Sequence, residues 1–116
     1  MIDDEVVLVL DQAPEFTDRY LGLVESADGD PGAAATFVEL ADYVAGLVAA
    51  LAQFRPALMH CLGAIEKVAE SSENAEELVV WSFFENLSPD DVRRLDLWLG
   101  PRTRSLLDEA DYSPDS

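Results

Sequence analysis

The sequence predicts an all-α fold, a single compact bundle of about six to seven antiparallel helices. Apolar residues recur at spacings of three and four along most of the chain, which is the period of an amphipathic helix. Proline, glycine and acidic residues divide the chain where such helices would start and end. The length of 116 residues, 49% of them hydrophobic, suits one core. We expect a single domain over residues 1–111 and a polar tail over 112–116.

The N-terminal quarter predicts two helices joined at a proline. The apolar run at residues 6–10 would also suit a buried strand, but the three carboxylates at 3–5 favour a first helical turn, where they complement the helix dipole. Pro14 suits the first position of a second helix. We expect that helix to end at the Asp-Gly-Asp-Pro-Gly segment of residues 28–32.

Two longer helices follow in the middle of the chain. One is predicted over residues 33–53, with a single apolar stripe from Phe37 to Leu51. Pro56 opens the next, in which apolar residues repeat at three and four from Leu58 to Ala69. This is the clearest amphipathic pattern in the chain.

A fifth helix is predicted over residues 74–87 and is apolar around most of its circumference. Such a helix belongs in the middle of a bundle or at a partner surface. Trp81 and Phe84 are expected in the core, because aromatic residues at this spacing are core residues in most helical domains. The alternative is that Trp81 and its neighbours line a ligand pocket.

Clear start and stop signals define the last two helices. Ser88 is expected to cap a sixth helix, with Pro89 at its first position and two carboxylates in its first turn. The pair Gly100-Pro101 ends it. A last short helix holds Leu106 and Leu107.

No catalytic or metal-binding signature occurs in the sequence. His60 and Cys61 are adjacent, so on a helix they point about 100° apart and cannot hold one ion together. Nucleophile, phosphate-binding, zinc and dinucleotide motifs are absent. The many paired carboxylates lie in exposed first turns, which do not separate their pKa values. We therefore expect neither an enzyme nor a bound cofactor, with His60 exposed and Cys61 in the core.

The formal net charge of −17 limits the possible partners. A surface this acidic repels nucleic acid and anionic membranes and attracts basic proteins. The acidic N-terminus does not resemble a secretory signal, and the longest weakly charged stretch, residues 43–54, is too short to span a bilayer. We expect a cytoplasmic protein without a transmembrane segment. The sequence does not indicate its oligomeric state.

The net negative charge is concentrated before residue 89, since residues 1–88 hold 17 acidic and 3 basic residues while residues 89–116 hold 7 acidic and 4 basic residues. If the helices alternate up and down, one end of the bundle gathers an acidic rim from three connections. The predicted partner-binding residues there are Asp28, Asp30, Glu70, Glu73, Glu76 and Glu77, beside the carboxylates at 3–5. Secondary candidates at the other end are Glu85, Asp90 and Asp91. The alternative is acidity that serves only solvation, as in halophilic proteins.

Two short motifs carry a resemblance to a known group of proteins. Residues 79–87 read Val-Val-Trp-Ser-Phe-Phe-Glu-Asn-Leu, and residues 99–103 read Leu-Gly-Pro-Arg-Thr. With Pro14-Glu15-Phe16 and the long helix over residues 37–51, this pattern resembles small, acidic, helical bacterial domains encoded beside polymorphic toxins and regarded as immunity proteins. The resemblance implies that the chain neutralises a toxin. It assigns no binding residue.

The resulting hypothesis is an antitoxin-like immunity protein that binds a cognate toxin domain through its acidic surface. Toxins that act on nucleic acid are basic where they hold phosphate, so an acidic rim can occupy that surface. Two alternatives remain. One is a helical adaptor that recognises a protein through the fifth helix, and the other is a ligand-binding protein with a pocket near Trp81.

Overall fold

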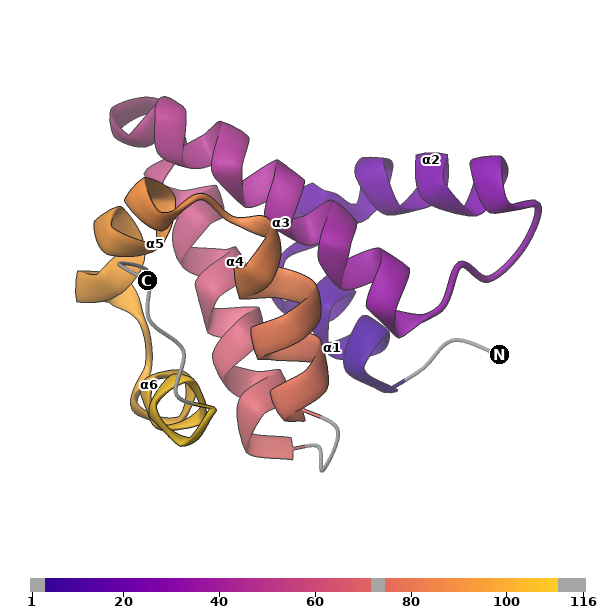
Figure 1. Ribbon diagram of the computed structural model, residues 1–116. Coiled ribbons are helices and arrows are strands. Elements are labelled where there is room, and N and C mark those ends of the chain that lie inside the picture. Colours follow the sequence, from indigo (N-terminus) through magenta and orange to yellow (C-terminus); the bar gives the residue numbers. More distant parts are fainter. Residues whose placement is uncertain (1–3, 72–74, 111–116) are drawn as a thin grey trace.

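The computed structural model describes residues 4–71 and 75–110 (Figure 1). Within these ranges every regular element is helical, which confirms the predicted all-α fold. The tail predicted at 112–116 lies outside them. The elements are α1 (Asp4–Gln12), the 3-10 turn η1 (Pro14–Phe16), α2 (Thr17–Ala27), α3 (Ala33–Ala49), α4 (Leu51–Ser71), the π-helix η2 (Glu76–Phe83), the 3-10 turn η3 (Phe84–Asn86), α5 (Pro89–Leu95), the 3-10 turn η4 (Asp96–Trp98) and α6 (Pro101–Glu109).

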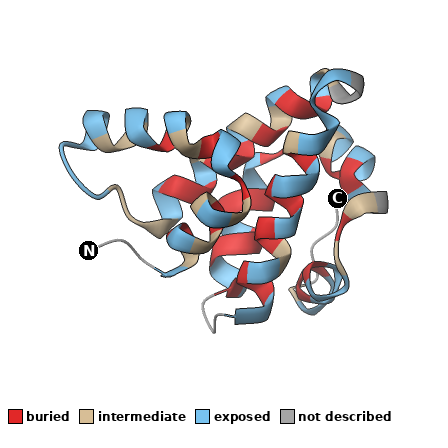
Figure 2. Cartoon of the chain, turned by 180° about the vertical axis from the view of Figure 1, so that it is seen from behind, coloured by how far each residue is buried: buried red, intermediate tan, exposed pale blue. Residues whose placement is uncertain are grey.

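The centre of the molecule is formed by α3, α4 and η2, which pack against one another. In Figure 1, α4 and η2 run side by side while α3 crosses them at an angle. The helix α1 packs on α4, α2 packs on α3, and α6 closes the remaining side against α4 and η2. Figure 2 shows that the buried residues gather on the inward faces of these helices, while exposed residues cover the outward faces.

The apolar run at the N-terminus forms a helix, as its acidic flank predicts. In α1, Val6 and Val9 are fully buried one turn apart while Val7 is half exposed, which is the pattern of a helix and not of a strand. Pro14 opens the turn η1 that leads into α2. The chain leaves α2 at Asp28, whose φ of 56° is left-handed. The predicted break at residues 28–32 is therefore present.

The boundary between the two central helices differs from the prediction. The helix expected over residues 33–53 ends at Ala49, and α4 begins at Leu51. A kink at Phe54 (φ −112°, ψ 21°) follows, two residues before Pro56. Proline has no N–H to donate, and its ring crowds the preceding turn, so the helix bends there. The sequence located the break correctly but assigned the turn before it to α3.

The fifth predicted helix is a π-helix followed by a 3-10 turn, and one of its aromatic residues lies elsewhere than predicted. Phe84 is fully buried and meets the Phe83 ring edge-on at a centroid distance of 4.9 Å. Trp81 is 48% exposed, so its predicted core position is wrong. On a segment apolar on nearly every side, neighbouring helices decide which side is covered. Here α3, α4 and α6 cover the other sides.

The start of α6 is capped by a side chain from another helix. Its N-cap residue Gly100 has no side chain to offer, so the free N–H groups of the first turn bond to Glu66 on α4. The Glu66 Oε2 atom accepts from the Arg102 N–H at 3.0 Å. Its Oε1 atom accepts from the Thr103 N–H at 2.9 Å and from the buried Thr103 hydroxyl at 2.8 Å. This contact holds α6 against α4.

The close approach of Glu66 explains the glycine at the N-cap position. A Cβ on Gly100 would lie 2.3 Å from the carboxyl carbon of Glu66. Burial raises the pKa of Glu66, but the hydrogen bonds from Thr103 and Arg102 outweigh burial and lower the pKa below its usual value. The carboxylate is therefore the form that the folded protein favours. At the start of α5 the expected local cap is present, since Ser88 Oγ accepts from the Asp91 N–H at 3.1 Å.

Truncation of the two aromatic residues of the fifth predicted helix should have unequal effects. Phe84→Ala should lower the free energy of unfolding by about 3–5 kcal/mol, because it leaves a cavity in the core. Trp81→Ala should cost about 1 kcal/mol or less, because the side chain is half in solvent. Urea denaturation of both variants measures the difference. Equal losses would contradict the arrangement of η2.

Removal of the Glu66 cap should destabilise the fold in a pH-dependent way. Glu66→Ala should lower the free energy of unfolding by about 1–2 kcal/mol at neutral pH. Since the folded-state pKa of Glu66 is lowered, its contribution is present above the usual pKa of a glutamate and is lost as pH falls through the folded-state pKa. The gap between wild type and variant should therefore narrow in acid, which urea titrations at several pH values test.

Gly100→Ala provides the control for this contact. The new methyl group would displace the Glu66 carboxylate and so lower the free energy of unfolding. This loss should nearly vanish in a variant that already carries Glu66→Ala, because the displaced carboxylate is then absent. Additive losses in the double variant would show that the two residues act independently.

Candidate functional site

The predicted partner-binding carboxylates lie at two corners of the molecule. Asp28 and Asp30 are exposed in the connection between α2 and α3. Glu70 is exposed at the end of α4, and Glu76 and Glu77 are exposed in the first turn of η2. Figures 1 and 2 show the α2–α3 connection at one corner, and the end of α4 with the start of η2 at another.

The secondary candidates lie in η3 and α5, and two of the predicted carboxylates lie outside the described ranges. Glu85 is exposed in η3, and the first turn of α5 holds Asp90, which is exposed, and Asp91, which is partly buried. Glu73, like Asp3, lies outside the described residues. The structure therefore brings Glu70, Glu76 and Glu77 to one edge, and Glu85 lies at the far end of η2 from them.

Four arginines are paired with the chain's own carboxylates. In the described part of the chain, these ion pairs join α2 to α3 or lie within the region of α5, η4 and α6. They are Arg19 with Glu39 and Asp42, Arg93 with Asp90, Arg102 with Glu109, and Arg104 with Asp96. The secondary candidate Asp90 is thus already partnered. The positive charge of these arginines offsets carboxylates away from η2.

The carboxylates of η2 and η3 have no ion pair in the described part of the chain, although Asp90 further on is paired with Arg93. Residues 68–92 hold seven acidic residues and no lysine or arginine. Among the described residues, no ion pair involves Glu76, Glu77 or Glu85. Negative potential is therefore concentrated along this part of the surface, where unpaired carboxylates attract cationic groups.

Trp81 is exposed, as are Glu77 and Glu85. The sequence pattern predicted Trp81 in the core, so it was missed as a surface residue. Glu77 and Glu85 stand four residues before and after it, and all three are exposed. Positions four apart share a helix face, so the acidic neighbours mark this face as the solvent side. That spacing is the sequence signal that could have identified Trp81 as exposed.

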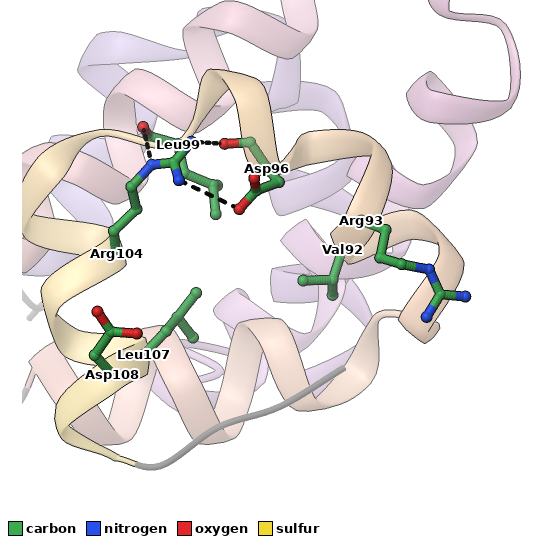
Figure 3. A pocket seen from close by; sticks show the side chains of 7 residues that line it. All are labelled: Val92, Arg93, Asp96, Leu99, Arg104, Leu107 and Asp108. Carbon is green, nitrogen blue, oxygen red and sulfur yellow. Dashed lines mark hydrogen bonds and ion pairs between the residues drawn. The ribbon is translucent and has the colours of Figure 1, made fainter. Parts of the chain in front are cut away.

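A hollow of about 490 Å³ lies between α5, η4 and α6 (Figure 3). Its apolar lining comes from Val92, Leu99 and Leu107, and its charged lining from Arg93, Arg104, Asp96 and Asp108. Trp81 does not line it, so this hollow is not the ligand pocket considered near Trp81.

The cations of this hollow are engaged by the protein itself. The Arg104 guanidinium turns back to Asp96 at 3.4 Å and to the Leu99 carbonyl at 3.3 Å. Figure 3 shows the Arg93 side chain directed away from the hollow, where it pairs with Asp90. With its arginines and Asp96 occupied and no histidine, serine or cysteine in its lining, the hollow offers a ligand apolar contact and the Asp108 carboxylate.

His60 and Cys61 point in different directions, as their adjacency on a helix predicts. Cys61 is fully buried, and His60 is exposed with its Nδ1 atom 2.5 Å from Glu15 Oε2. Burial and, to a smaller extent, the Glu15 carboxylate raise the pKa of the Cys61 thiol to about 12. Among the described residues, no group of three or more histidine, cysteine or acidic side chains is arranged to hold a metal ion.

Comparison with protein-family models, curated proteins and solved structures finds no match for this chain. No described helix is both long enough and apolar enough to cross a membrane. The surface around η2 is therefore interpreted from its own geometry and charge.

The thiol of Cys61 should be unreactive in the folded protein. At pH 8 a thiol with a pKa of about 12 is protonated, and its burial also blocks access of the reagent. We expect thiol titration with a disulfide reagent to be at least about a hundred-fold slower than in urea. A rapid reaction without denaturant would contradict the burial of this residue.

Proposed function

We propose that this chain is an immunity protein, which binds and neutralises a cognate bacterial toxin domain in the cytoplasm of the producing cell. The observation that carries the proposal is the set of exposed carboxylates on η2 and η3 without an ion pair in the described part of the chain, Glu76, Glu77 and Glu85, on a protein with a net charge of −17. The resemblance to acidic domains encoded beside toxins supports it. Binding of the toxin, and not chemistry, would be the whole activity.

Electrostatic competition supplies a mechanism for neutralisation. A toxin that acts on nucleic acid presents lysine and arginine side chains where it holds phosphate groups. Exposed carboxylates around η2 can pair with those side chains and occupy the surface that the substrate needs. Charge of opposite sign also raises the rate of encounter, and this increase falls with added salt.

A protein-binding adaptor is the second candidate, and the exposure of Trp81 favours it equally. Tryptophan is enriched where proteins bind one another, so a half-exposed indole indicates a protein partner without naming its class. A ligand carrier has less support, because the arginines of the hollow between α5 and α6 are held internally.

Protection of cells separates these candidates. If a toxin domain is encoded beside this gene, it should stop growth when expressed alone and should be tolerated when this protein is co-expressed. Formation of a complex between this full-length protein and the toxin domain is then measured by size-exclusion chromatography and calorimetry. If no neighbouring toxin is bound or neutralised, the immunity proposal is wrong and the adaptor remains.

Charge reversal around η2 should weaken protection. The triple variant Glu76→Lys, Glu77→Lys and Glu85→Lys should slow association with the toxin by about ten-fold or more, because these exposed carboxylates steer the basic partner. Stopped-flow binding at two salt concentrations measures this. Surface carboxylates without ion pairs contribute little to stability, so the variant should unfold near the wild-type urea midpoint.

A matched reversal elsewhere controls for net charge. Asp11→Lys, Asp18→Lys and Glu25→Lys change the charge equally on α1 and α2, where all three residues are exposed. This control should retain most of the association rate. Equal slowing by both variants would mean that only the overall field matters, and slowing by the control alone would place the interface on α1 and α2.

A further inference from the structure

The chain contains an internal example of how its acidic helix faces receive an arginine. Arg19 lies with its Cζ atom 5.6 Å from the centre of the Tyr43 ring. Its Nε atom is 3.0 Å from Glu39 and its Nη2 atom is 2.6 Å from Asp42. One guanidinium thus covers an aromatic ring and pairs with a carboxylate four residues before that ring on the helix.

A second aromatic ring outside the core is covered in a similar way. The Cζ atom of Arg55 lies 5.7 Å from the centre of the Trp98 ring, which is partly buried. Among the described residues, no arginine or lysine lies over Trp81, although it is more exposed than Tyr43 or Trp98. Residues 68–92 contain no basic residue, and no arginine from another part of the described chain reaches this ring.

The face of η2 repeats the acceptor half of the Arg19 contact. Glu77 precedes Trp81 by four residues, as Glu39 precedes Tyr43, and Glu85 follows Trp81 by four. Glu77 and Trp81 lie in the π-helix η2, where residues four or five apart are neighbours on successive turns, and Glu85 lies in the 3-10 turn η3 that follows; all three residues are exposed. We call Glu77, Trp81 and Glu85 the Trp81 face. It presents an aromatic ring between two carboxylates and lacks the cation that the corresponding contact on α3 contains.

We propose that the Trp81 face is the docking site for an arginine of a partner protein, whose guanidinium lies over the indole ring and pairs with Glu77 or Glu85. This inference deepens the proposed function, since it names the contact by which a basic toxin would be held. Arginine suits the site better than lysine, because its planar group both stacks on an aromatic ring and bonds a carboxylate. Removal from water would strengthen both contacts.

A second copy of the chain is a poorer occupant of this face. A second copy would place its own net charge of −17 against Glu77 and Glu85 of the first copy. Repulsion between like charges therefore opposes the association of two copies. Nucleic acid is disfavoured for the same reason. Charge complementarity therefore selects a basic protein segment.

Selection from a random peptide library displayed on phage, with the full-length protein as bait at low salt, tests the contact without the toxin. We expect the selected peptides to be enriched in arginine. Their binding, measured by calorimetry with synthetic copies, should weaken about thirty-fold on Trp81→Ala and also weaken on the double variant Glu77→Gln and Glu85→Gln. Replacement of the critical arginine by lysine in the peptide should weaken binding too.

Phe54→Ala is the matched control, because Phe54 is an exposed aromatic residue outside the acidic segment. It should leave peptide binding unchanged. Peptides without arginine, binding that Trp81→Ala leaves unaltered, or failure to select any peptide would overturn the proposal. So would sedimentation that shows a wild-type dimer dissociated by Trp81→Ala, since a second copy would then occupy the face.

The two proposals fail separately. If arginine peptides bind the Trp81 face but no toxin is neutralised, the docking contact stands and the protein is an adaptor. If the neighbouring toxin is neutralised and the selected peptides ignore Trp81, the immunity function stands and its interface lies elsewhere.

Discussion

The enclosure of η2 is the constraint on which the rest of the structure depends. This segment is apolar on nearly every side, so it is stable in water only when other helices cover it. The helices α3, α4 and α6 provide the cover, and α6 is held in place by the Glu66 carboxylate at its first turn. One side of η2 stays open, and Trp81 lies there.

The excess of acidic residues also shapes the structure. Carboxylates are costly to bury without a partner, so they occupy the outer faces or, like Glu66, receive several hydrogen bonds. Several of the few basic residues form ion pairs with carboxylates of the same molecule, as Arg19 does with α3 and Arg104 does with η4. Residues 68–92 contain no basic residue, and the proposed basic partner would supply the missing positive charge there.

The histidine, the cysteine and the arginines of the hollow are engaged or enclosed within the described part of the molecule. Its cysteine is buried and protonated, its histidine is tied to Glu15 at the surface, and the arginines of its hollow are held by neighbouring groups. The proposed function uses none of these side chains. An exposed indole between two unpaired carboxylates is suited instead to recognition, where aromatic and charged groups contribute most when a partner removes them from water.

The sequence by itself determined the helices and most of their ends, because these depend on local rules. Ser88 caps α5, Pro56 lies beside the kink in α4, and the acidic flank of residues 6–10 gives a helix there. The tertiary structure decided which sides of η2 are covered, because its apolar residues run around most of the helix and only the carboxylates beside Trp81 mark an outer side in the sequence. The tertiary structure also brought Glu66 of α4 to the first turn of α6, 37 positions further along the sequence. It separated carboxylates that the sequence pattern grouped on one rim, because helix crossing angles follow from side-chain packing and not from connection length.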